Sequence, residues 1–322
     1  MNTILLIITG LVLFLYALNT LSQGLKELSG DKLKFFLDRF TNNVLKGILS
    51  GIIVTILLDS SSVVIIMTIA LVNARALTFR QAMGVVMGAN IGTTFSSQIF
   101  ALSISEYAAI PIAIGFVLMF FAKKPFLTNL GKVIFSFGLL FFGLFTMEEA
   151  VEPLKESQYF VSWLASLENT WKGMLTGALV TVVVQSSSAT LGMVISLASQ
   201  QLITLTAAIA VLLGAELGTC ADTLLASIGR SKAAVRTGLF HLLFNLTTIF
   251  LGMLLLPYFT QLVAVVSQGA KLSQSVANAH MLFNGLGVVL MLPFVRGFEM
   301  LLYKLVPEKQ NSVTPETEAV SN

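Results

Sequence analysis

The chain has 322 residues, of which 56% are hydrophobic and 11% are charged, with a formal net charge of +3. Soluble domains carry about 25% charged residues, and a mean hydropathy of +0.88 is too apolar for a soluble fold, so water-soluble enzymes and nucleic-acid-binding proteins are excluded. One cysteine, Cys220, and two histidines exclude a disulfide framework and supply too few ligands for a zinc or haem cofactor, so we expect an all-α polytopic membrane protein with no cofactor.

Seven apolar runs are predicted to cross the bilayer, since a spanning helix needs roughly 20 residues. In chain order they cover 3–23, 81–103, 106–122, 126–147, 203–228, 235–256 and 275–296. The first run has neither a basic leader nor a small-residue cleavage site, so we interpret it as a span and not as a signal peptide. The sequence predicts one transmembrane transport domain over 1–305, followed by a polar, disordered tail at 306–322.

The charges between these runs predict the orientation of the chain. Basic residues collect after the first run, before the second, around Pro125, after residue 228 and at the C-terminal end, whereas residues 148–168 carry five glutamates. Lys and Arg are enriched in cytoplasmic loops. We therefore expect a multi-pass protein of the cell (inner or plasma) membrane, with its N-terminus outside and its C-terminus in the cytoplasm.

Two further apolar segments, 44–73 and 170–199, carry polar residues at their middle. A continuous helix would place these groups near the centre of the bilayer, where an unsatisfied polar group is costly. The charge pattern also requires each segment to begin and end on the same side. Both segments are therefore predicted to be re-entrant hairpins of two short helices, entering from opposite sides.

The two segments belong to an internal repeat with an offset of 126 residues. Sixteen of the 43 aligned pairs between 51–93 and 177–219 are identical, including both serine triplets, which is more than apolar bias produces. We expect two inverted-topology repeats, about 1–122 and 126–256, each with a re-entrant hairpin and a broken transmembrane helix, plus an extra span at 275–296. Inverted repeats with interrupted helices are typical of secondary transporters, whose substrate sites lie near the midplane.

The serine triplets point to an ion site. A helix that begins in the membrane exposes free backbone N–H groups and the positive end of its dipole, which suits an oxyanion. Hydroxyls and freed carbonyl oxygens at the same break suit Na⁺. The alternative, tight helix packing at small residues, is less able to explain two triplets in register.

Three acids are predicted to lie deep in the membrane: Asp59, Glu216 and Asp222. Intramembrane carboxylates are functional candidates, and beside an anion they require cations or protons to neutralise them. For Asp222 a structural role is an equal alternative. The two His-x-x-Phe-Asn patterns, at His241 and His280, are interpreted as pairing neighbouring helices.

The doubled motifs resemble the type II sodium–phosphate cotransporter family. Gln185-Ser186-Ser187-Ser188 and the Gly-Ala-Asn-Ile-Gly-Thr-Thr stretch at 88–94 match the family pattern, and the resemblance covers about residues 1–300. It implies Na⁺-driven uptake of inorganic phosphate, with ligands at both hairpin tips and at broken spans over 88–94 and 214–220. Some relatives carry a C-terminal PhoU-type domain, which the sequence lacks. Asp59 and Glu216 stand where the family usually has Gln and Asn.

The predicted partners are phosphate, Na⁺ as the coupling ion and the lipid bilayer, with a homodimer as one alternative for the oligomeric state. The residues predicted to bind substrate or ions are Asp59, Ser60, Ser61, Ser62, Gln185, Ser186, Ser187, Ser188, Asn90, Thr93, Thr94, Glu216 and Thr219. Those predicted to couple ions or to pair helices are Thr55, Thr181, Asp222, Asn245 and Asn284.

Two other functions stay open at this level. A related transporter could carry a different small anion or use H⁺ in place of Na⁺, because both family departures introduce acid at the predicted site. A membrane-embedded serine hydrolase could use Ser61 or Ser187 with His241 or His280. The symmetric duplication of the serines argues against the hydrolase, since that chemistry needs only one nucleophile and one base.

Overall fold

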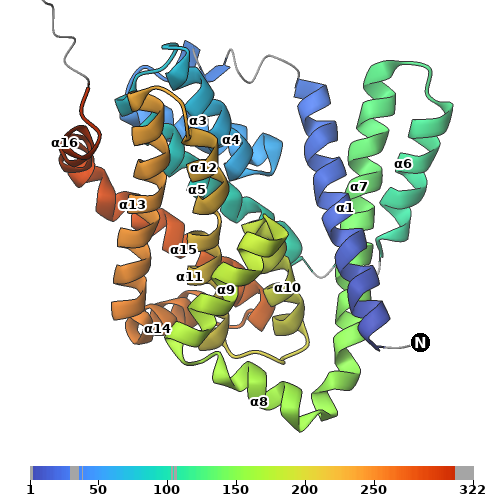
Figure 1. The fold of residues 1–322 in the computed structure, drawn as a ribbon. Helices are drawn as coiled ribbons and strands as arrows, with labels where there is room; N and C mark the ends of the chain where they lie inside the picture. Colours follow the sequence, from blue (N-terminus) through green and yellow to red (C-terminus); the bar gives the residue numbers. More distant parts are fainter. Residues whose placement is uncertain (1–2, 30–35, 38, 103, 105–106, 309–322) are drawn as a thin grey trace, which may run out of the picture.

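A computed structural model describes residues 3–29, 36–37, 39–102, 104 and 107–308 of the chain. Within these ranges every regular element is a helix (Figure 1), which confirms the predicted all-α class. Of the predicted tail, only residues 306–308 fall inside the described ranges. The disorder predicted for the rest of the tail lies outside them.

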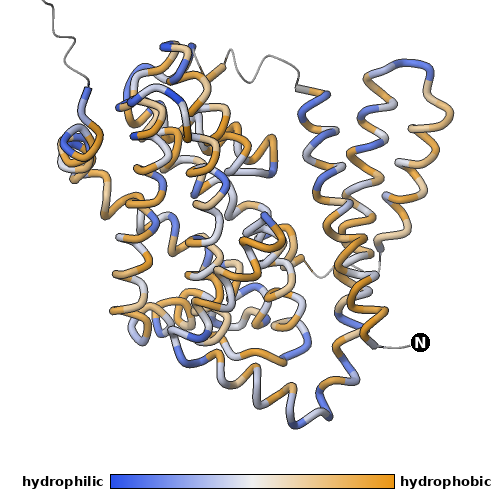
Figure 2. Tube along the Cα trace, in the orientation of Figure 1, coloured by the Kyte–Doolittle hydropathy of each residue, from blue (hydrophilic) through white to orange (hydrophobic). Residues whose placement is uncertain are grey.

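All seven predicted spans are helical. They correspond to α1 (Thr3–Ser29), α5 (Phe79–Phe100), α6 (Ala109–Phe121), α7 (Pro125–Val151), α11 (Leu205–Gly218) with α12 (Cys220–Ser227), α13 (Lys232–Leu254) and α15 (Leu272–Met291). Five helical stretches in the described part are long and apolar enough to cross a membrane: Thr3–Leu28, Pro125–Glu156, Leu205–Ser227, Lys232–Leu254 and Leu272–Leu305. Figure 2 shows that hydrophobic residues dominate along these helices, while polar residues gather at their ends.

Three helices, α1, α6 and α7, form a bundle beside the rest of the molecule (Figure 1). Glycines allow their backbones to touch: a Cβ atom on Gly138 of α7 would lie 2.7 Å from the backbone nitrogen of Ile112 in α6, and one on Gly143 would lie 2.7 Å from that of Phe14 in α1. The 3-10 turn η2 (Glu152–Glu156) and α8 (Gln158–Ser166) then lead from α7 into the remaining helices, which we call the core. The bundle flanks the core and packs against it, with the ring centroid of the buried Phe14 in α1 lying 5.5 Å from that of Phe100 in α5.

Both serine-containing segments break where the sequence predicts. In the first, α3 (Val44–Leu58) ends and α4 (Ser61–Asn73) begins; in the second, α9 (Thr170–Val184) ends and α10 (Ser187–Ser199) begins. The residue after each first helix is left-handed, with φ of 53° at Asp59 and 57° at Gln185. We call α3–α4 hairpin 1 and α9–α10 hairpin 2, and the turns at 59–62 and 185–188 tip 1 and tip 2.

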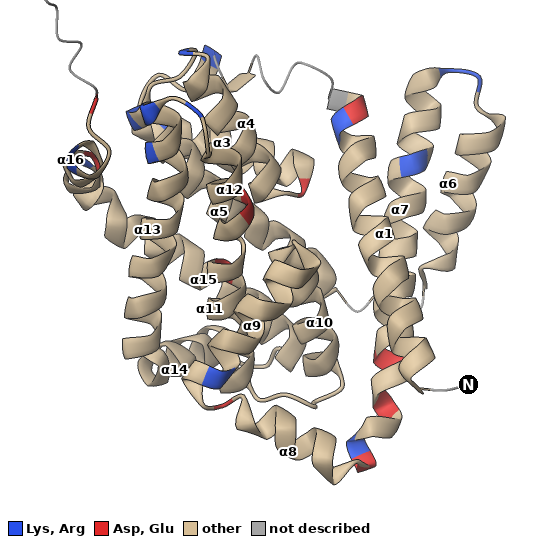
Figure 3. Cartoon of the chain, viewed as in Figure 1, with Lys and Arg blue, Asp and Glu red and all other residues tan. Residues whose placement is uncertain are grey.

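The two hairpins start and finish at opposite ends of the helices. At the end of hairpin 1, Asn73 accepts a hydrogen bond from the backbone of Ser231, within the basic stretch before α13. At the end of hairpin 2, Ser199 donates to Glu148 at the acidic end of α7. Figure 3 shows most Lys and Arg at one end of the helices and the acids of α7 to α8 at the other. The charge separation matches the prediction, and re-entry into a bilayer stays a prediction.

The repeat is visible in the packing as well as in the sequence. A Cβ on Gly88 would collide with the carbonyl oxygen of Ile48, and a Cβ on Gly214, 126 residues later, would collide with that of Met174. The first helix of each hairpin therefore lies against the next long helix in the same way. Close backbone approach of this kind is typical of helices packed within a membrane.

One prediction about the repeats is wrong. The first repeat was expected to have a broken helix over 88–94, but α5 runs without interruption from Phe79 to Phe100. In the second repeat a break does occur, at Thr219 between α11 and α12. Two additional short helices follow the predicted spans, namely α14 (Leu256–Val266) and α16 (Val295–Leu305), the latter joined to α15 by η3 (Leu292–Phe294).

Candidate functional site

Tip 1 carries two carboxylates. Asp59 accepts a hydrogen bond from Ser96 of α5, and the carboxylate of Asp222 at the start of α12 lies close to the hydroxyl of Ser62. The Ser62 hydroxyl also lies 3.3 Å from that of Thr219, so α4 contacts the break between α11 and α12. Ser60 caps α4 by accepting from the backbone N–H of Val63. Tip 1 is therefore rich in oxygen atoms and in negative charge.

Tip 2 has the same backbone and different chemistry. Ser186 caps α10 by accepting from the backbone N–H of Ala189 at 3.1 Å, and Ser187 and Ser188 are buried just behind it. The residue at the position of Asp59 is Gln185, an amide. Among the described residues, no carboxylate forms a hydrogen bond with Gln185 or with this triplet. Tip 2 thus combines a helix N-terminus with neutral hydrogen-bonding groups.

A pair of equivalent threonines also differs between the hairpins. In hairpin 2, the hydroxyl of Thr181 lies 2.8 Å from that of Thr190. In hairpin 1, Val64 occupies the position of Thr190, and the fully buried hydroxyl of Thr55 has no hydrogen-bond partner in the described part of the chain. A buried polar group without a partner is costly, so Thr55 is a candidate to meet a bound ion one helical turn before Asp59.

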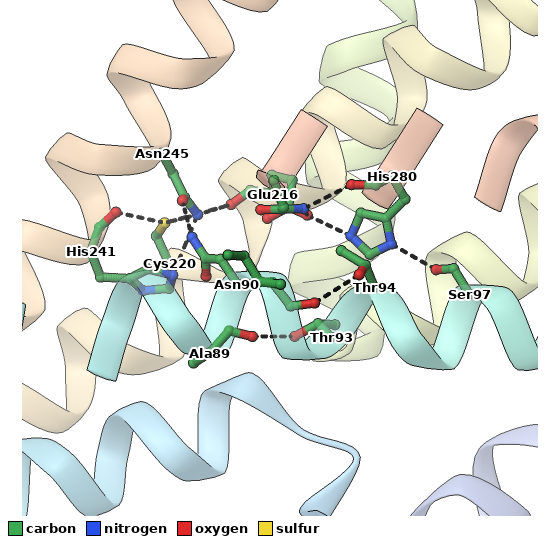
Figure 4. Close-up of polar contacts among 12 residues, drawn as sticks. Ala89, Asn90, Thr93, Thr94, Ser97, Glu216, Cys220, His241, Asn245 and His280 are labelled. Atoms are coloured by element: carbon green, nitrogen blue, oxygen red, sulfur yellow. Dashed lines mark hydrogen bonds and ion pairs between the residues drawn. The ribbon is translucent and has the colours of Figure 1, made fainter. Parts of the chain in front are cut away.

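A buried polar network lies between α5, α11, α12, α13 and α15 (Figure 4). Its centre is the carboxylate of Glu216, whose Oε1 accepts from His280 Nε2 and from Asn284 Nδ2, both at 2.9 Å. His280 Nδ1 lies 2.7 Å from the hydroxyl of Ser97 in α5. The side chain of His280 is fully buried and that of Glu216 is 5% exposed, so the pair is shielded from water.

The other arm of the network repeats this pattern with an amide in place of the carboxylate. Asn90, equivalent to Glu216 in the repeat, donates to Asn245 Oδ1 at 2.8 Å. Asn245 in turn donates to the backbone oxygen of Glu216 at 2.7 Å and lies 3.3 Å from His241 Nε2. His241 Nδ1 lies 2.8 Å from Thr223, which occupies the position of Ser97. His280 therefore bridges α5 and α11, whereas His241 contacts α12 and is linked to α5 through Asn245.

The hydrogen bonds also define which ring nitrogen carries a proton. Asn245 Nδ2 must donate to the Glu216 carbonyl, so the nearby Nε2 of His241 acts as an acceptor and its Nδ1–H donates to Thr223. His280 Nε2 faces a carboxylate and donates to it. Both histidines thus turn Nδ1 to a hydroxyl, but the role of Nε2 differs, because His280 Nε2 meets a carboxylate and His241 Nε2 meets an amide N–H.

The structure brings most of the predicted site residues into two places. Ser62, Thr219 and Asp222 meet at tip 1, and Asn90, Glu216, Asn245 and Asn284 belong to the network. Thr93 and Thr94 instead bond to carbonyl oxygens of their own helix, α5. The interpretation of both histidines as helix-pairing residues agrees with their contacts.

The predicted site set missed Ser96, Ser97 and Thr223. The repeat offset of 126 residues places Ser96 on Asp222 and Ser97 on Thr223, so the alignment of the repeats with the predicted residue Asp222 could have identified this part of α5. In the part of the chain that the structure describes, no three His, Cys, Asp or Glu side chains converge as a transition-metal site requires. Hydroxyl and carboxylate oxygens suit hard cations such as Na⁺ instead.

Comparison with known proteins assigns the chain to a family. The profile of the Na⁺/Pi-cotransporter family matches the chain twice, over residues 13–149 and 150–291. YqeW of Bacillus subtilis, an uncharacterized protein, is 30% identical over 309 residues, which cover 95% of this chain and 99% of YqeW. No solved structure matches the chain significantly.

Two other relatives are named for a function. YjbB of Escherichia coli, named for inorganic phosphate export, is 26% identical over 298 residues, and the match spans 92% of this chain but about half (54%) of YjbB. The human sodium-dependent phosphate transport protein 2B is 33% identical over 101 residues, or 31% of this chain and 15% of that protein. With the tandem match over most of its length, the chain belongs to the Na⁺/Pi-cotransporter family.

Proposed function

We propose that the protein is a Na⁺-coupled symporter of inorganic phosphate that works by alternating access. The family and the names of the relatives support phosphate as the substrate and Na⁺ as the coupling ion. The observation that carries the proposal is the unequal charge of the two hairpin tips, and we take tip 1 as the cation half and tip 2 as the anion half of one site.

The cation half is tip 1. Two carboxylates, Asp59 and Asp222, lie at this tip, together with the hydroxyls of Ser62 and Thr219. Two unit charges 4 Å apart interact by about 4 kcal/mol at the effective dielectric of a protein surface, and more strongly inside. An anion beside these carboxylates would be repelled by that amount, whereas Na⁺ is attracted. The unpaired hydroxyl of Thr55 adds an oxygen donor in the same hairpin.

The anion half is tip 2. Gln185 and the hydroxyls of Ser186, Ser187 and Ser188 can donate to phosphate oxygens, and the N-terminus of α10 adds free N–H groups and the positive end of its dipole. Cations bound at tip 1 would offset the charge of phosphate bound at tip 2. Binding of each ion then favours binding of the other, which is the thermodynamic basis of symport.

Glu216 has a supporting role in this scheme. Its Oε1 accepts hydrogen bonds from both His280 and Asn284, so the carboxylate holds α11 against α15. The hydrolase alternative is not supported, because it needs a histidine that acts as a base on Ser61 or Ser187. Both histidines bond to other groups, and among the described residues neither bonds to these serines. The match to a cotransporter family also favours transport over hydrolysis.

The membrane orientation is part of the proposal. With the basic end of the helices in the cytoplasm, hairpin 1 enters from inside and hairpin 2 from outside. Symport down the Na⁺ gradient then moves phosphate into the cell. YjbB is named for export, so the experiment below measures the direction of net phosphate flux.

The test is uptake of labelled phosphate into proteoliposomes with a set Na⁺ gradient. Ser187→Ala is expected to raise the KM for phosphate by roughly ten- to a hundredfold, because a hydrogen bond to a charged group is worth about 1.5–3 kcal/mol. Asp222→Asn is expected to raise the Na⁺ concentration needed for half-maximal uptake and to change the phosphate KM less at saturating Na⁺. Reversed effects would overturn the division of the site.

The same vesicles separate the alternatives. Uptake that follows a pH gradient at constant Na⁺ would replace Na⁺ by H⁺ as the coupling ion. Uptake of sulfate in preference to phosphate would replace the substrate. Efflux driven by an outward-directed Na⁺ gradient is expected from a symporter, and no response to Na⁺ in either direction would refute Na⁺ coupling.

A further inference from the structure

The two halves of the core share their backbone at the tips but differ in how the tips are held. Ser60 and Ser186 have φ of −156° and −155°, and the first helix of each hairpin packs against the following helix through equivalent glycines. Because the local backbone is the same at both tips, we compare the contacts that each tip makes with other helices.

The clearest difference is at Thr93 and its repeat equivalent, Thr219. Thr93 lies inside the continuous helix α5, and its hydroxyl donates to the carbonyl of Ala89 in its own helix at 3.0 Å. Thr219 lies at the break between α11 and α12, and its hydroxyl meets Ser62 of tip 1. The equivalent contact at tip 2 would join Ser188 to Thr93, and among the described residues no such hydrogen bond is present.

A second contact holds tip 1 alone. Ser22 of α1 donates to the backbone oxygen of Leu58, the last residue of α3, at 2.7 Å. This oxygen is one of the carbonyls that the end of α3 leaves without a helical partner. At tip 2 the equivalent oxygen belongs to Val184, and no side chain within the described ranges donates to it. Hairpin 1 is thus tied both to the bundle and to the second repeat.

Both hairpins border a cavity at the end that lies away from the tip. A polar cavity of about 460 Å³ lies between α7, the end of α10 and the start of α15. Its walls include Glu148, Ser199 and Ser273, at the acidic end of the helices. A cavity of about 540 Å³ lies likewise at the start of hairpin 1, lined by Asn43, Val44 and Gln81, so the two halves are distinguished by the contacts at their tips and not by their cavities.

We propose that Ser62–Thr219 and Ser188–Thr93 are alternating latches, and that closure of one accompanies opening of the other during the transport cycle. This inference relies on the proposed alternating access. In the state described, the first latch and the Ser22 contact are closed. In the opposite state α11 and α12 form one continuous helix, as α5 is here, the Thr219 hydroxyl bonds within its own helix, and Ser188 reaches Thr93 at an interruption of α5.

The physical basis is that the two repeats have nearly the same sequence at these positions, so each can adopt either conformation at similar free energy. An element with two arrangements of similar energy is shifted by a small bias. One neutral hydrogen bond is worth roughly a two- to twelvefold change in the ratio of two states. Loss of one latch is therefore expected to shift the population measurably without unfolding the protein.

The experiment measures disulfide formation between Thr93→Cys and Ser188→Cys in a Cys220→Ser background, with an added thiol oxidant, in vesicles that contain neither phosphate nor Na⁺. Cross-linking is expected to be slow in this background. Adding Ser62→Ala is expected to speed it by about two- to twelvefold, because the latch that holds the present state is lost. Adding Ser22→Ala, in another helix, is expected to act in the same direction.

Ser61→Ala is the matched control, since Ser61 belongs to the same triplet and forms no hydrogen bond with α11 or α12 in the described structure. Equal rates for Ser61→Ala and Ser62→Ala would overturn the proposal. So would the absence of cross-linking in every background, including with a longer bifunctional thiol reagent, for variants that still elute as folded protein. Since the assay uses no substrate, its outcome is independent of whether phosphate is the cargo.

Discussion

The hydrogen bond from His280 to the buried carboxylate of Glu216 should be the strongest single contact in the core. Its nitrogen and oxygen are 2.9 Å apart and both side chains are almost completely buried. Removal of one partner of a buried pair typically costs about 3–5 kcal/mol, because the other partner is left without compensation. Glu216→Ala also leaves Asn284 without its acceptor, so we expect this variant to lie at the upper end of that range.

A double-mutant cycle isolates the interaction from the cavities that each substitution creates. We expect Glu216→Ala and His280→Ala to lower the free energy of unfolding by about 3–5 kcal/mol each and the double variant to lower it by about 2–3 kcal/mol less than their sum. The measurement is denaturant unfolding of the purified protein in detergent micelles, followed by circular dichroism.

The control cycle combines Glu216→Ala with Ser136→Ala, a buried serine of the bundle helix α7. Substitutions without shared contacts add within about 0.5 kcal/mol. A coupling energy below about 0.5 kcal/mol for Glu216 and His280 would show that the pair behaves like an exposed salt bridge. The reasoning from burial and distance would then be refuted, and with it the supporting role given to Glu216.

Three further predictions follow from the fold and from tip 1. Gly214→Ala should lower thermal stability by about 1–3 kcal/mol, because its Cβ would collide with a backbone carbonyl of α9, whereas Gly285→Ala, with no atom near its Cβ, should change little; equal melting temperatures for the two variants would contradict the packing. Asp59→Asn should weaken the Na⁺ dependence of phosphate uptake across a grid of Na⁺ and pH, and a flattened pH response with unchanged Na⁺ dependence would indicate a proton-coupling role instead. A cysteine at Glu149 in a Cys220→Ser background should react with an impermeant thiol reagent from outside and one at Lys124 should not, and reaction of both from one face would disprove the inverted arrangement.

The sequence by itself determined the local features of this protein. Both hairpins break at the predicted residues because the determinants are short-range: a serine that can cap the next helix follows a residue in the left-handed conformation. The seven spans are also local, since an apolar run of sufficient length has few alternatives to a helix in a membrane. The fixed offset of 126 residues likewise follows from the chain alone.

Only the tertiary structure decided how the two repeats differ. The Gly-Ala-Asn-Ile-Gly-Thr stretch and its copy Gly-Ala-Glu-Leu-Gly-Thr predict the same break, yet α5 is continuous and the other copy is interrupted at Thr219. The difference accompanies the contact of Thr219 with Ser62, 157 positions away in the chain. A helix that is nearly balanced between two conformations takes the one that its distant partner stabilises, and no local pattern contains that information.

The roles of the acids were decided in the same way. In sequence, Asp59, Glu216 and Asp222 are all predicted to lie deep in the membrane, with a structural role as an equal alternative for Asp222 alone. In space, Glu216 is compensated by His280 and Asn284, while Asp59 and Asp222 gather at tip 1. Whether a buried carboxylate is a structural partner or a candidate ion ligand depends on the groups that other helices bring within about 3 Å of it. These groups come from helices far apart in the chain, so local sequence patterns do not contain the information.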